Sequence, residues 1–342
     1  LINGRRSVDG GDYQTIPAVM VERIEILKDG GAAAYGADAV SGVVNIITRK
    51  DLEGVEVELL TADWMDTDSG AQTGVSAVFG KSFDKGHFVA GVEYVDQEEA
   101  YQSDAPWDFF QDSYYIYPTG CEAQVTAPFD GTTSGGCYPI GSSRIPEGRL
   151  TTLSQGTFMN PDGSGLVPFD GRTYNYAPVN YIQTPYKKTN IFLDGRMEIT
   201  DTIEFSAMLR SNNRKSAQEL APQPYNSPTD PAYNGVWVDG DGAEVAYNGI
   251  SPDNYYLVQA FNAAGLSPEP IRDARRRMVE TTRRFEQQIE QTQINLQLDG
   301  SELFGTDISW TAYYNYGRRT REDVDYGQFF GPNLSNAVGP SA

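Results

Sequence analysis

Alternation of polar and apolar residues with a period of two dominates this sequence from residue 54 onward. The clearest run spans residues 190–199, where four aliphatic side chains and Gly195 share one side and Phe192 is the one apolar residue on the other. This pattern is typical of a strand with one wet and one apolar face. It restarts at Ile203 after only Asp201-Thr202, a connection typical of a tight hairpin.

Seven segments carry this alternation, and many exceed the ~5–6 residues of ordinary strands. They cover about residues 55–59, 75–83, 88–94, 190–199, 203–210, 294–298 and 308–316. Short connections (84–86, 201–202, about 300–306) alternate strictly with long ones (about 62–73, 101–184 and 217–279). Outer-membrane barrels alternate in this way, with tight periplasmic turns and long outer loops. A β-sandwich is the alternative, although its long connections need not all lie at one end.

The two faces of the predicted strands fit the wall of such a barrel. One face carries charged residues such as Glu56, Glu58 and Arg210, as a hydrated lumen requires. The other face is aliphatic, and Trp310 and Tyr314 on it suit an interfacial aromatic girdle. An ordinary sheet in an acidic secreted protein, with its polar side in solvent, would show the same two faces.

Composition excludes some classes of function. The 47 acidic residues exceed the 26 basic ones, giving a net charge of −21, which argues against nucleic acid as a partner. No run of about 18 apolar residues predicts a transmembrane helix, and no signal peptide is recognisable at the start. The first residue reads like the inside of a strand and residues 336–342 read like a loop, so we expect truncation at both ends.

The long loop at 101–184 holds two further features. Cys121 and Cys137 lie among turn residues and are expected to form a disulfide in an oxidising compartment, free thiols being the alternative. Tyr101, Trp107 and Tyr114 belong to an aromatic cluster that either contacts a ligand or packs the loop against itself. No metal site is predicted, because two cysteines and the single, remote His87 do not supply four ligands.

The first 50 residues follow a different plan. They predict strands at about 21–28 and 43–48, with short helical turns after Pro17 and at 32–35. Gly30, Gly31, Gly36 and Gly42 mark turns that we expect to need a positive φ.

Here the sequence resembles the C-terminal half of the plug domain of TonB-dependent outer-membrane receptors. The matching strings are Ile2-Asn3-Gly4-Arg5, Ile16-Pro17, Val21-Glu22-Arg23-Ile24-Glu25-Ile26-Leu27-Lys28, Tyr35-Gly36 and Gly42-Val43-Val44-Asn45-Ile46-Ile47-Thr48-Arg49. The departure is Asp29-Gly30-Gly31, where many members have Arg-Gly-Pro. The resemblance implies a mostly β fold: a partial α+β plug at 1–53, then about seven antiparallel strands, at 54–342, of a barrel of about 22 strands.

The resemblance also implies a function in the Gram-negative outer membrane. Receptors of this family use TonB to import a scarce, bulky solute such as a siderophore, vitamin, haem, oligosaccharide or peptide, without catalysis or a cofactor. Lipid and lipopolysaccharide would be further partners, and the TonB box would lie upstream of Leu1. The alternative is a secreted or surface acidic β-sheet module for binding or adhesion, without transport.

Candidate site residues follow from the same comparison. Arg6, Asp12 and Tyr13 would face substrate from a plug apex, and Tyr101, Trp107 and Tyr114 would do so from the loop. Contacts between plug and barrel would come from Arg5, Glu22, Arg23 and Glu25, while Tyr35, Gly36, Gly42 and Asn45 carry the family motif. Arg5 and Arg6 could instead pair with wall carboxylates such as Glu56 or Glu58.

Overall fold

The computed structural model describes residues 1–8, 12–28, 31–50, 52–106, 108–113, 115–116, 138–139 and 141–341, with backbone only for 13, 34, 108–109, 115–116 and 138–139. Its contacts divide the chain into two compact units, which we describe separately. The first contains residues 1–99, 183–217 and 286–324, and the second contains 100–182, 218–285 and 325–342. Among the described helices, none combines the length and apolarity needed to cross a membrane.

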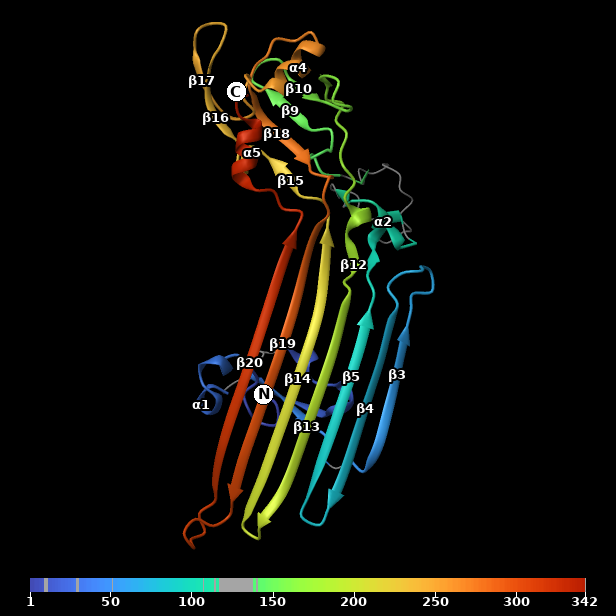
Figure 1. Cartoon of the computed structure of the whole chain (residues 1–342), viewed down its shortest axis with the longest axis vertical. Helices are drawn as coiled ribbons and strands as arrows, with labels where there is room; N and C mark the ends of the chain where they lie inside the picture. The colour runs from blue at the N-terminus through green and yellow to red at the C-terminus, as the bar shows by residue number, and fades with distance from the viewer. Residues whose placement is uncertain are drawn as a thin grey trace. The chain divides into compact units, whose positions relative to one another are not determined.

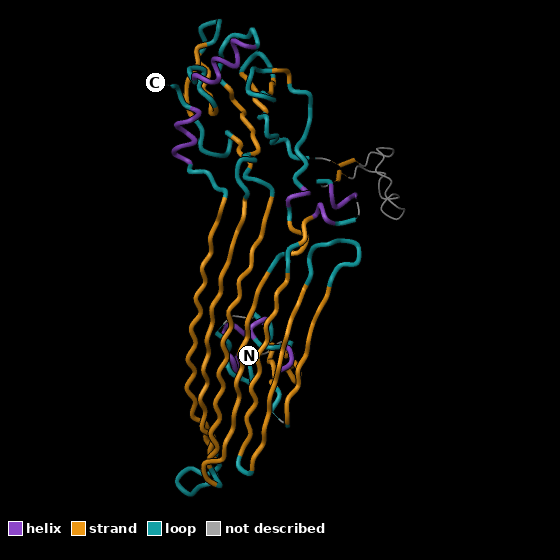
Figure 2. Tube along the Cα trace, turned by 45° about the vertical axis from the view of Figure 1, so that its right-hand side comes forward, coloured by secondary structure: helices purple, strands orange, loops and turns teal. Residues whose placement is uncertain are grey.

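The first unit is built on a seven-stranded antiparallel sheet, which we call the wall (Figure 1). Its strand order is β20-β19-β14-β13-β5-β4-β3. The strands are β3 (Gly54–Ala62), β4 (Gln72–Phe83), β5 (Gly86–Gln97), β13 (Tyr186–Thr200), β14 (Ile203–Leu220), β19 (Arg283–Gly300) and β20 (Trp310–Tyr326). Figure 2 shows them as long adjacent strands joined by short turns at one end. The predicted seven strands are therefore confirmed. The strict alternation of short and long connections is not, because the predicted long connection between β3 and β4 (63–71) is no longer than the predicted short one between β19 and β20 (301–309).

Three strands are about ten residues longer than their alternation predicted. β14 continues to Leu220 rather than ending near residue 210. β19 begins at Arg283 rather than near residue 294, and β20 continues to Tyr326 rather than ending near 316. The added segments are polar on both faces, as in Arg283-Arg284-Phe285-Glu286-Gln287-Gln288. The strands continue past the point where the polarity pattern stops, because backbone N–H and C=O groups pair between strands regardless of which side chains the two faces carry.

The pleat separates an exposed apolar face of the wall from a face that carries the N-terminal segment (residues 1–53). Val55, Val57 and Leu59 on the outer face are 65%, 62% and 78% exposed, as residues meant for lipid would be. Four apolar side chains on the inner face are instead buried, packing with Ile16 and Met20 of the N-terminal segment. They are Val78, Val89, Phe192 and Met208.

The N-terminal segment pairs β1 (Val21–Leu27) with β2 (Val43–Thr48), and Ile2 forms a parallel bridge to Ile46. Four short helices complete it: η1 (Tyr13–Thr15), η2 (Ala18–Met20), α1 (Ala32–Tyr35) and η3 (Ala37–Ala39). Gly36 and Gly42 have positive φ values of 86° and 131°, as predicted. The same expectation for Gly31 is wrong, since its φ is −71°. Close packing instead accounts for a glycine at position 31, because a Cβ there would lie 2.8 Å from Val43 Cγ2.

The second unit contains strands that the sequence presented as loop. A five-stranded sheet has the order β11-β10-β9-β18-β15. Its strands are β9 (Arg149–Thr152), β10 (Thr157–Met159), β11 (Val167–Pro168), β15 (Pro224–Asn226) and β18 (Ile271–Arg277). Helix α4 (Tyr255–Ala263) buries Leu257 and Phe261 with residues of this sheet, and Asn254 caps its first turn.

Smaller elements complete the second unit. The hairpin β16 (Tyr233–Val238) and β17 (Glu244–Gly249) and the pair β12 (Tyr181–Gln183) and β6 (Ala100–Tyr101) are each two-stranded. The rest are η4 (Gln102–Asp104), α2 (Asp108–Gln111), β7 (Tyr115–Ile116), β8 (Tyr138–Pro139), η5 (Ala177–Val179) and α5 (Gly331–Val338).

Candidate functional site

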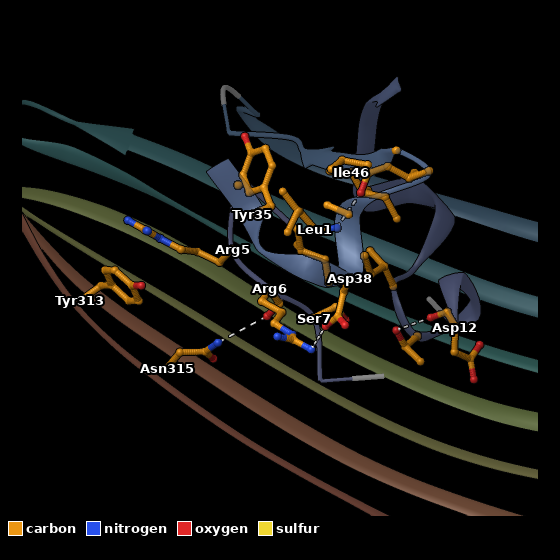
Figure 3. Close-up of a pocket in the computed structure, with 18 residues that line it drawn as sticks. Leu1, Arg5, Arg6, Ser7, Asp12, Tyr35, Asp38, Ile46, Tyr313 and Asn315 are labelled. Atoms are coloured by element: carbon orange, nitrogen blue, oxygen red, sulfur yellow. Dashed lines mark hydrogen bonds and ion pairs between the residues drawn. The ribbon is translucent and has the colours of Figure 1, made fainter. Parts of the chain in front are cut away.

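A cavity of about 730 Å³ lies between the N-terminal segment and strand β20 (Figure 3). Both sides belong to the first unit of the chain. Its polar lining comes mostly from the start of the chain, joined by Tyr313 and Asn315 from the wall. The side chains that decide its chemistry are Arg5, Arg6, Ser7, Asp12, Tyr35 and Asp38.

A tight turn at Asn3-Gly4 presents the two arginines. Asn3 and Gly4 have φ values of 48° and 78°, and Ile2 and Arg5 exchange backbone hydrogen bonds of 2.8 and 2.9 Å. Positive φ at both central residues is the type I′ arrangement, for which Asn-Gly is the preferred sequence. Asn3 also fixes the turn to β2, because it donates to Thr48 Oγ1 at 2.8 Å and accepts from Thr48 N at 3.0 Å.

Asn45, a residue of the family motif on β2, binds the same turn at Gly4. Its Oδ1 accepts from Gly4 N at 2.9 Å, and its Nδ2 donates to Glu25 Oε2 at 3.3 Å. Gly42 lets β2 begin beside the end of β1, since a Cβ on it would lie 2.5 Å from the carbonyl oxygen of Leu27. The motif residues therefore build the support of the turn.

The two arginines have different partners. The guanidinium of Arg5 donates from Nε to Gln297 Oε1 at 3.0 Å and stacks over the Tyr313 ring, 4.1 Å from its centroid. Arg6 forms an ion pair with Asp38, and these side chains are 76% and 71% exposed. Figure 3 shows Arg5 reaching toward Tyr313 and Arg6 toward Asp38. Arg5 is thus held by the wall, whereas Arg6 sits in an exposed pair that water and a ligand can reach.

A buried arginine of β14 anchors the segment that follows. Arg210 is 1% exposed and donates from Nη1 to Thr15 Oγ1 at 2.7 Å and from Nη2 to Ser7 Oγ at 2.6 Å. It also donates from Nε to Gln293 Oε1 at 3.0 Å, and the Gln293 amide donates to the carbonyl oxygen of Arg6 at 2.9 Å. One guanidinium therefore joins two wall strands to Ser7 and Thr15 of the N-terminal segment.

A second polar group docks the same residues on β5, β13 and β14. Asn190, fully buried, donates to Glu93 Oε2 at 2.7 Å and to the carbonyl oxygen of Gln14 at 2.8 Å. Asp12 forms an ion pair with Arg214 at 3.0 Å, with only 15% of the Asp12 side chain exposed. The structure thus places Asp12, a predicted substrate residue, against the wall.

Between these polar groups, an apolar side chain fills a gap in the wall. Met20 is fully buried, and a Cβ on Gly91 would lie 2.5 Å from its Cγ and 2.6 Å from its Sδ. Val78 and Phe192 pair with Gly91 from either side. Gly91 is therefore the recess that accepts Met20.

Glu22, Arg23 and Glu25, the other residues predicted to link the plug to the barrel, lie on β1. Arg23 pairs with Glu22 at 2.6 Å and with Glu25 at 3.0 Å, and all three are about half exposed. The alternative that Arg5 or Arg6 pairs with Glu56 is wrong. Glu56 is instead held by both Nη atoms of Arg49, at 2.6 and 2.7 Å. Arg49 is only seven residues away along the chain, and this pair raises its pKa.

The predicted loop residues are only partly described. The Tyr101 ring packs edge-on against Tyr181, with 4.9 Å between centroids. Trp107, Tyr114, Cys121 and Cys137 lie outside the described residues, as does the side chain of Tyr13. Within the described residues, no group of three or more His, Cys, Asp or Glu side chains is arranged to hold a metal ion.

Sequence reasoning missed several residues of this site: Met20, Gly91, Asn190, Arg210 and Gln293. A signal existed for some of them. Apolar residues at inner-face positions, such as Phe192, break the alternation where the N-terminal segment packs. For Arg210 and Gln293 no local signal exists, because a hydrated lumen also requires polar residues.

Comparison with known proteins agrees with this geometry. Residues 1–43 match the family model described as TonB-dependent Receptor Plug Domain. Residues 1–43 are therefore a plug domain of the kind found in TonB-dependent receptors. The N-terminal segment, which contains these residues, is called the plug segment from here on.

Two solved structures from Acinetobacter baumannii show a weak likeness to this chain. One is BauA, the ferric preacinetobactin receptor, at 11% identity and a TM-score of 0.41, covering 92% of this chain and 38% of that one. The other is the siderophore receptor PiuA, at 10% identity and a TM-score of 0.25, covering 89% and 52%. The receptor chain thus spans about half or less of either structure, and likenesses this weak say nothing about its substrate.

Proposed function

We propose that this receptor imports a bulky solute across the Gram-negative outer membrane, driven by contact with TonB. The observation that supports the proposal is a family-matched plug segment seated on the inner face of a barrel wall. Family members bind and translocate their solute without making or breaking covalent bonds. The residues described above therefore have binding and gating roles. We assign 1–53 to the plug and 54–342 to the barrel.

Many contacts between the plug segment and the wall are polar, which suits an interface that must separate during transport. Its contacts through Arg210, Asn190 and Arg214 are hydrogen bonds and an ion pair. A net hydrogen bond contributes about 0.5–1.5 kcal/mol, or about 1.5–3 kcal/mol with a charged group, because water replaces the lost partner. A displaced plug can therefore be hydrated contact by contact, which a wholly apolar interface would not allow.

The geometry also separates two kinds of plug residue. Arg6 and Asp38 form an exposed pair in the cavity, and Tyr35 lines the same space at 47% exposure. We assign these three to substrate contact. Asp12, held by Arg214, links the plug to the wall. The aromatic loop residues Tyr101, Trp107 and Tyr114 stay proposed ligand contacts.

Uptake by cells carrying the complete gene tests the proposal. Labelled iron chelates, haem, cobalamin, oligosaccharides and peptides are supplied to matched hosts with and without TonB. We expect one solute class to enter only when TonB is present, while binding of that class to the cell surface persists without it. TonB-independent uptake would refute the proposed function.

Two variants refine the assignment of substrate contact. Arg6→Ala and Asp38→Ala should weaken binding of the imported solute, because they alter the exposed pair in the cavity. Arg23→Ala is the matched control, since Arg23 is also an exposed, ion-paired arginine of the plug segment but does not line this cavity. Equal binding by all three variants would remove Arg6 and Asp38 from the site.

A further inference from the structure

Arginines gather around strand β18 of the second unit, in a protein whose net charge is −21. The strand ends in Arg275-Arg276-Arg277, Arg144 lies on the segment beside it, and Arg283 begins β19. The backbone N–H of Arg277 donates to the carbonyl oxygen of Ile145 at 3.1 Å, which places residues 142–146 along the strand end.

Arg277 is the buried member of this group, with 6% of its surface exposed. It donates from Nη1 to the carbonyl oxygen of Pro222 at 2.7 Å and from Nη2 to Ser142 Oγ at 2.8 Å. Its Cζ lies 5.3 Å from the centroid of the Tyr174 ring. Its Nε is buried and has no hydrogen-bond partner. Leaving a charged donor buried without an acceptor is costly.

The neighbouring charges increase that cost. Burial lowers the pKa of Arg277 most strongly, and the positive charges of Arg144 and Arg283 lower it further. Within the described part of the chain, no carboxylate lies at ion-pair distance from Arg144, Arg277 or Arg283. Nearby carboxylates are already engaged, Asp273 by Arg275 at 2.7 Å and Glu280 by Arg276.

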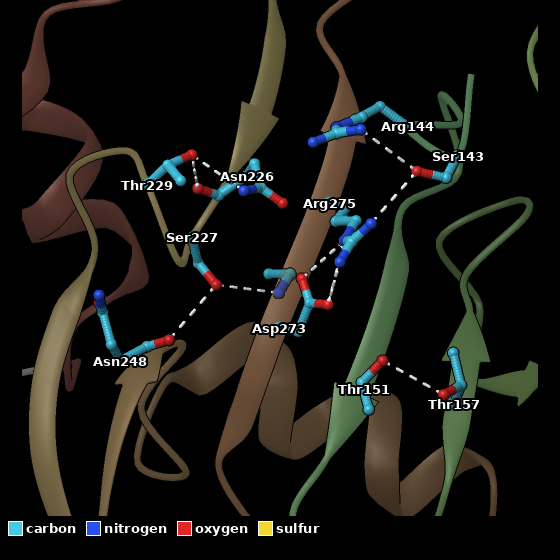
Figure 4. A network of polar contacts seen from close by, with 11 residues as sticks. Ser143, Arg144, Thr151, Thr157, Asn226, Ser227, Thr229, Asn248, Asp273 and Arg275 are labelled. Carbon is cyan, nitrogen blue, oxygen red and sulfur yellow. Dashed lines mark hydrogen bonds and ion pairs between the residues drawn. The ribbon is translucent and has the colours of Figure 1, made fainter.

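Two serine hydroxyls position Arg144, which has no carboxylate partner among the described residues. Arg144 Nη1 donates to Ser143 Oγ at 3.4 Å, and Arg275 Nη1 donates to the same hydroxyl at 3.3 Å (Figure 4). The Ser142 hydroxyl, which accepts from Arg277, also accepts from the Arg144 backbone N–H at 3.2 Å. Two adjacent serines thus tie Arg144 to the arginines of β18.

We propose that Arg144, Arg277 and Arg283 bind an oxyanion: a carboxylate, sulfate or phosphate group. Guanidinium groups suit planar or tetrahedral oxyanions because they present several donors in a fixed fork. A bound anion would accept from the orphaned Nε of Arg277 and offset three positive charges at once. That this oxyanion belongs to the imported solute rests on the proposed function, whereas the site itself does not.

Titration calorimetry on the purified, full-length receptor in detergent tests the site, with inorganic phosphate as probe at fixed ionic strength. We expect phosphate to bind the wild type. Arg144→Gln and Arg283→Gln, both at half-buried positions, should each weaken binding about tenfold or more, the usual effect of losing a charge-assisted hydrogen bond. Arg277→Lys keeps the charge but removes the fork, and it should weaken binding while the protein stays folded by near-UV circular dichroism.

Arg272→Gln is the matched control, because Arg272 is an exposed arginine of the same strand and its loss changes the net charge equally. Its phosphate affinity should stay within twofold of wild type. No phosphate binding by the wild type, or equal weakening by Arg272→Gln and Arg144→Gln, would overturn the proposal.

Two further arms identify the source of the oxyanion. Glucose 6-phosphate against glucose reports a soluble ligand, and bisphosphorylated against dephosphorylated lipid A in micelles reports a lipid one. Arg144-dependent binding of glucose 6-phosphate alone supports a soluble solute, whereas such binding of lipid A alone overturns the assignment to the imported solute. The two proposals fail independently. Solute uptake by cells without TonB would refute the proposed function, but it would not change the calorimetric result for the oxyanion site.

Discussion

Replacing Gly91 with alanine should loosen the plug segment by closing the recess that Met20 fills. The new Cβ would lie 2.5 Å from Met20 Cγ and 2.6 Å from Sδ, well inside contact distance. Met20 is fully buried in the same cluster as Val78 and Phe192. Overpacking of this kind costs about 1–3 kcal/mol, and the flexibility of methionine places the alanine variant toward the lower end.

Hydrogen exchange of the β1–β2 amides in the purified full-length receptor measures this loss. Toward that lower end, about 1–2 kcal/mol, protection should fall roughly five- to 30-fold, at about 1.4 kcal/mol per factor of ten. Gly195→Ala is the control, because a Cβ there meets Phe88 Cβ at an ordinary 3.6 Å. It should leave plug protection unchanged.

The double variant decides whether the contact with Met20 is the cause. Met20→Ala alone should cost about 2–5 kcal/mol through the cavity it leaves. In that background Gly91→Ala should cost close to nothing, since its methyl group enters the vacated space, giving a coupling of about 0.5–3 kcal/mol. Strict additivity of the two substitutions, or full protection in Gly91→Ala, would refute the packing argument.

Three further substitutions test other parts of the structure. Asn3→Ala should destabilise the plug segment by about 2–4 kcal/mol, because alanine tolerates the left-handed turn poorly and both bonds to Thr48 are lost; unchanged exchange of the Thr48 amide would contradict this. Arg210→Gln should cost at least about 3 kcal/mol of plug docking and expose residues 7–15 to protease, whereas wild-type protection would contradict it. Burial disfavours the ionised form of Glu269, but hydrogen bonds from Ser154, Thr152 and the Gln155 backbone outweigh it and hold its pKa below the ordinary value. Its stabilising contribution is therefore present above the unfolded pKa of about 4.3 and is lost as pH falls through the lower folded pKa, so Glu269→Gln should flatten the acid dependence of thermal unfolding.

The strands of the wall could be predicted because a lipid-facing side favours apolar residues and a lumen-facing side favours polar ones, so polarity alternates along each strand. Ile191, Leu193 and Met197 stay 42–46% exposed on the outer face, so the alternation survives along the strand. Strand length was underestimated where both faces are polar, as in the first half of β19. The motif of the plug segment predicted its two strands and the turns at Gly36 and Gly42, because few residues other than glycine meet those backbone requirements. The turn at Asn3-Gly4 was not predicted, although Asn-Gly is the preferred sequence for it.

The second unit and the oxyanion site could not be predicted in the same way. Strands of two to four residues, such as β11 and β9, are too short to show a period. They also pair across long separations, since β9 lies beside β18, which is more than 100 residues later. The arginines of β18 are visible in the sequence, but their neighbour Arg144 is brought to them only by this pairing.

The exceptions to the alternation explain how the plug segment is held. Val78, Val89, Phe192 and Met208 lie at inner-face positions where a hydrated lumen would favour polar residues, and all four pack in the cluster that contains Met20. Exposing them to water would cost about 25 cal/mol per Å² of apolar surface. Each polar contact of Ser7, Asp12 and Thr15 contributes only about 0.5–3 kcal/mol, because water replaces the lost partner. A displacement that begins at Ser7 and Thr15 and leaves Met20 seated against Gly91 therefore breaks mainly polar contacts, together with the packing of Val8 at Gly317. Movement of the plug segment should start at Ser7 and Thr15, and the Met20 contact should be the last to separate.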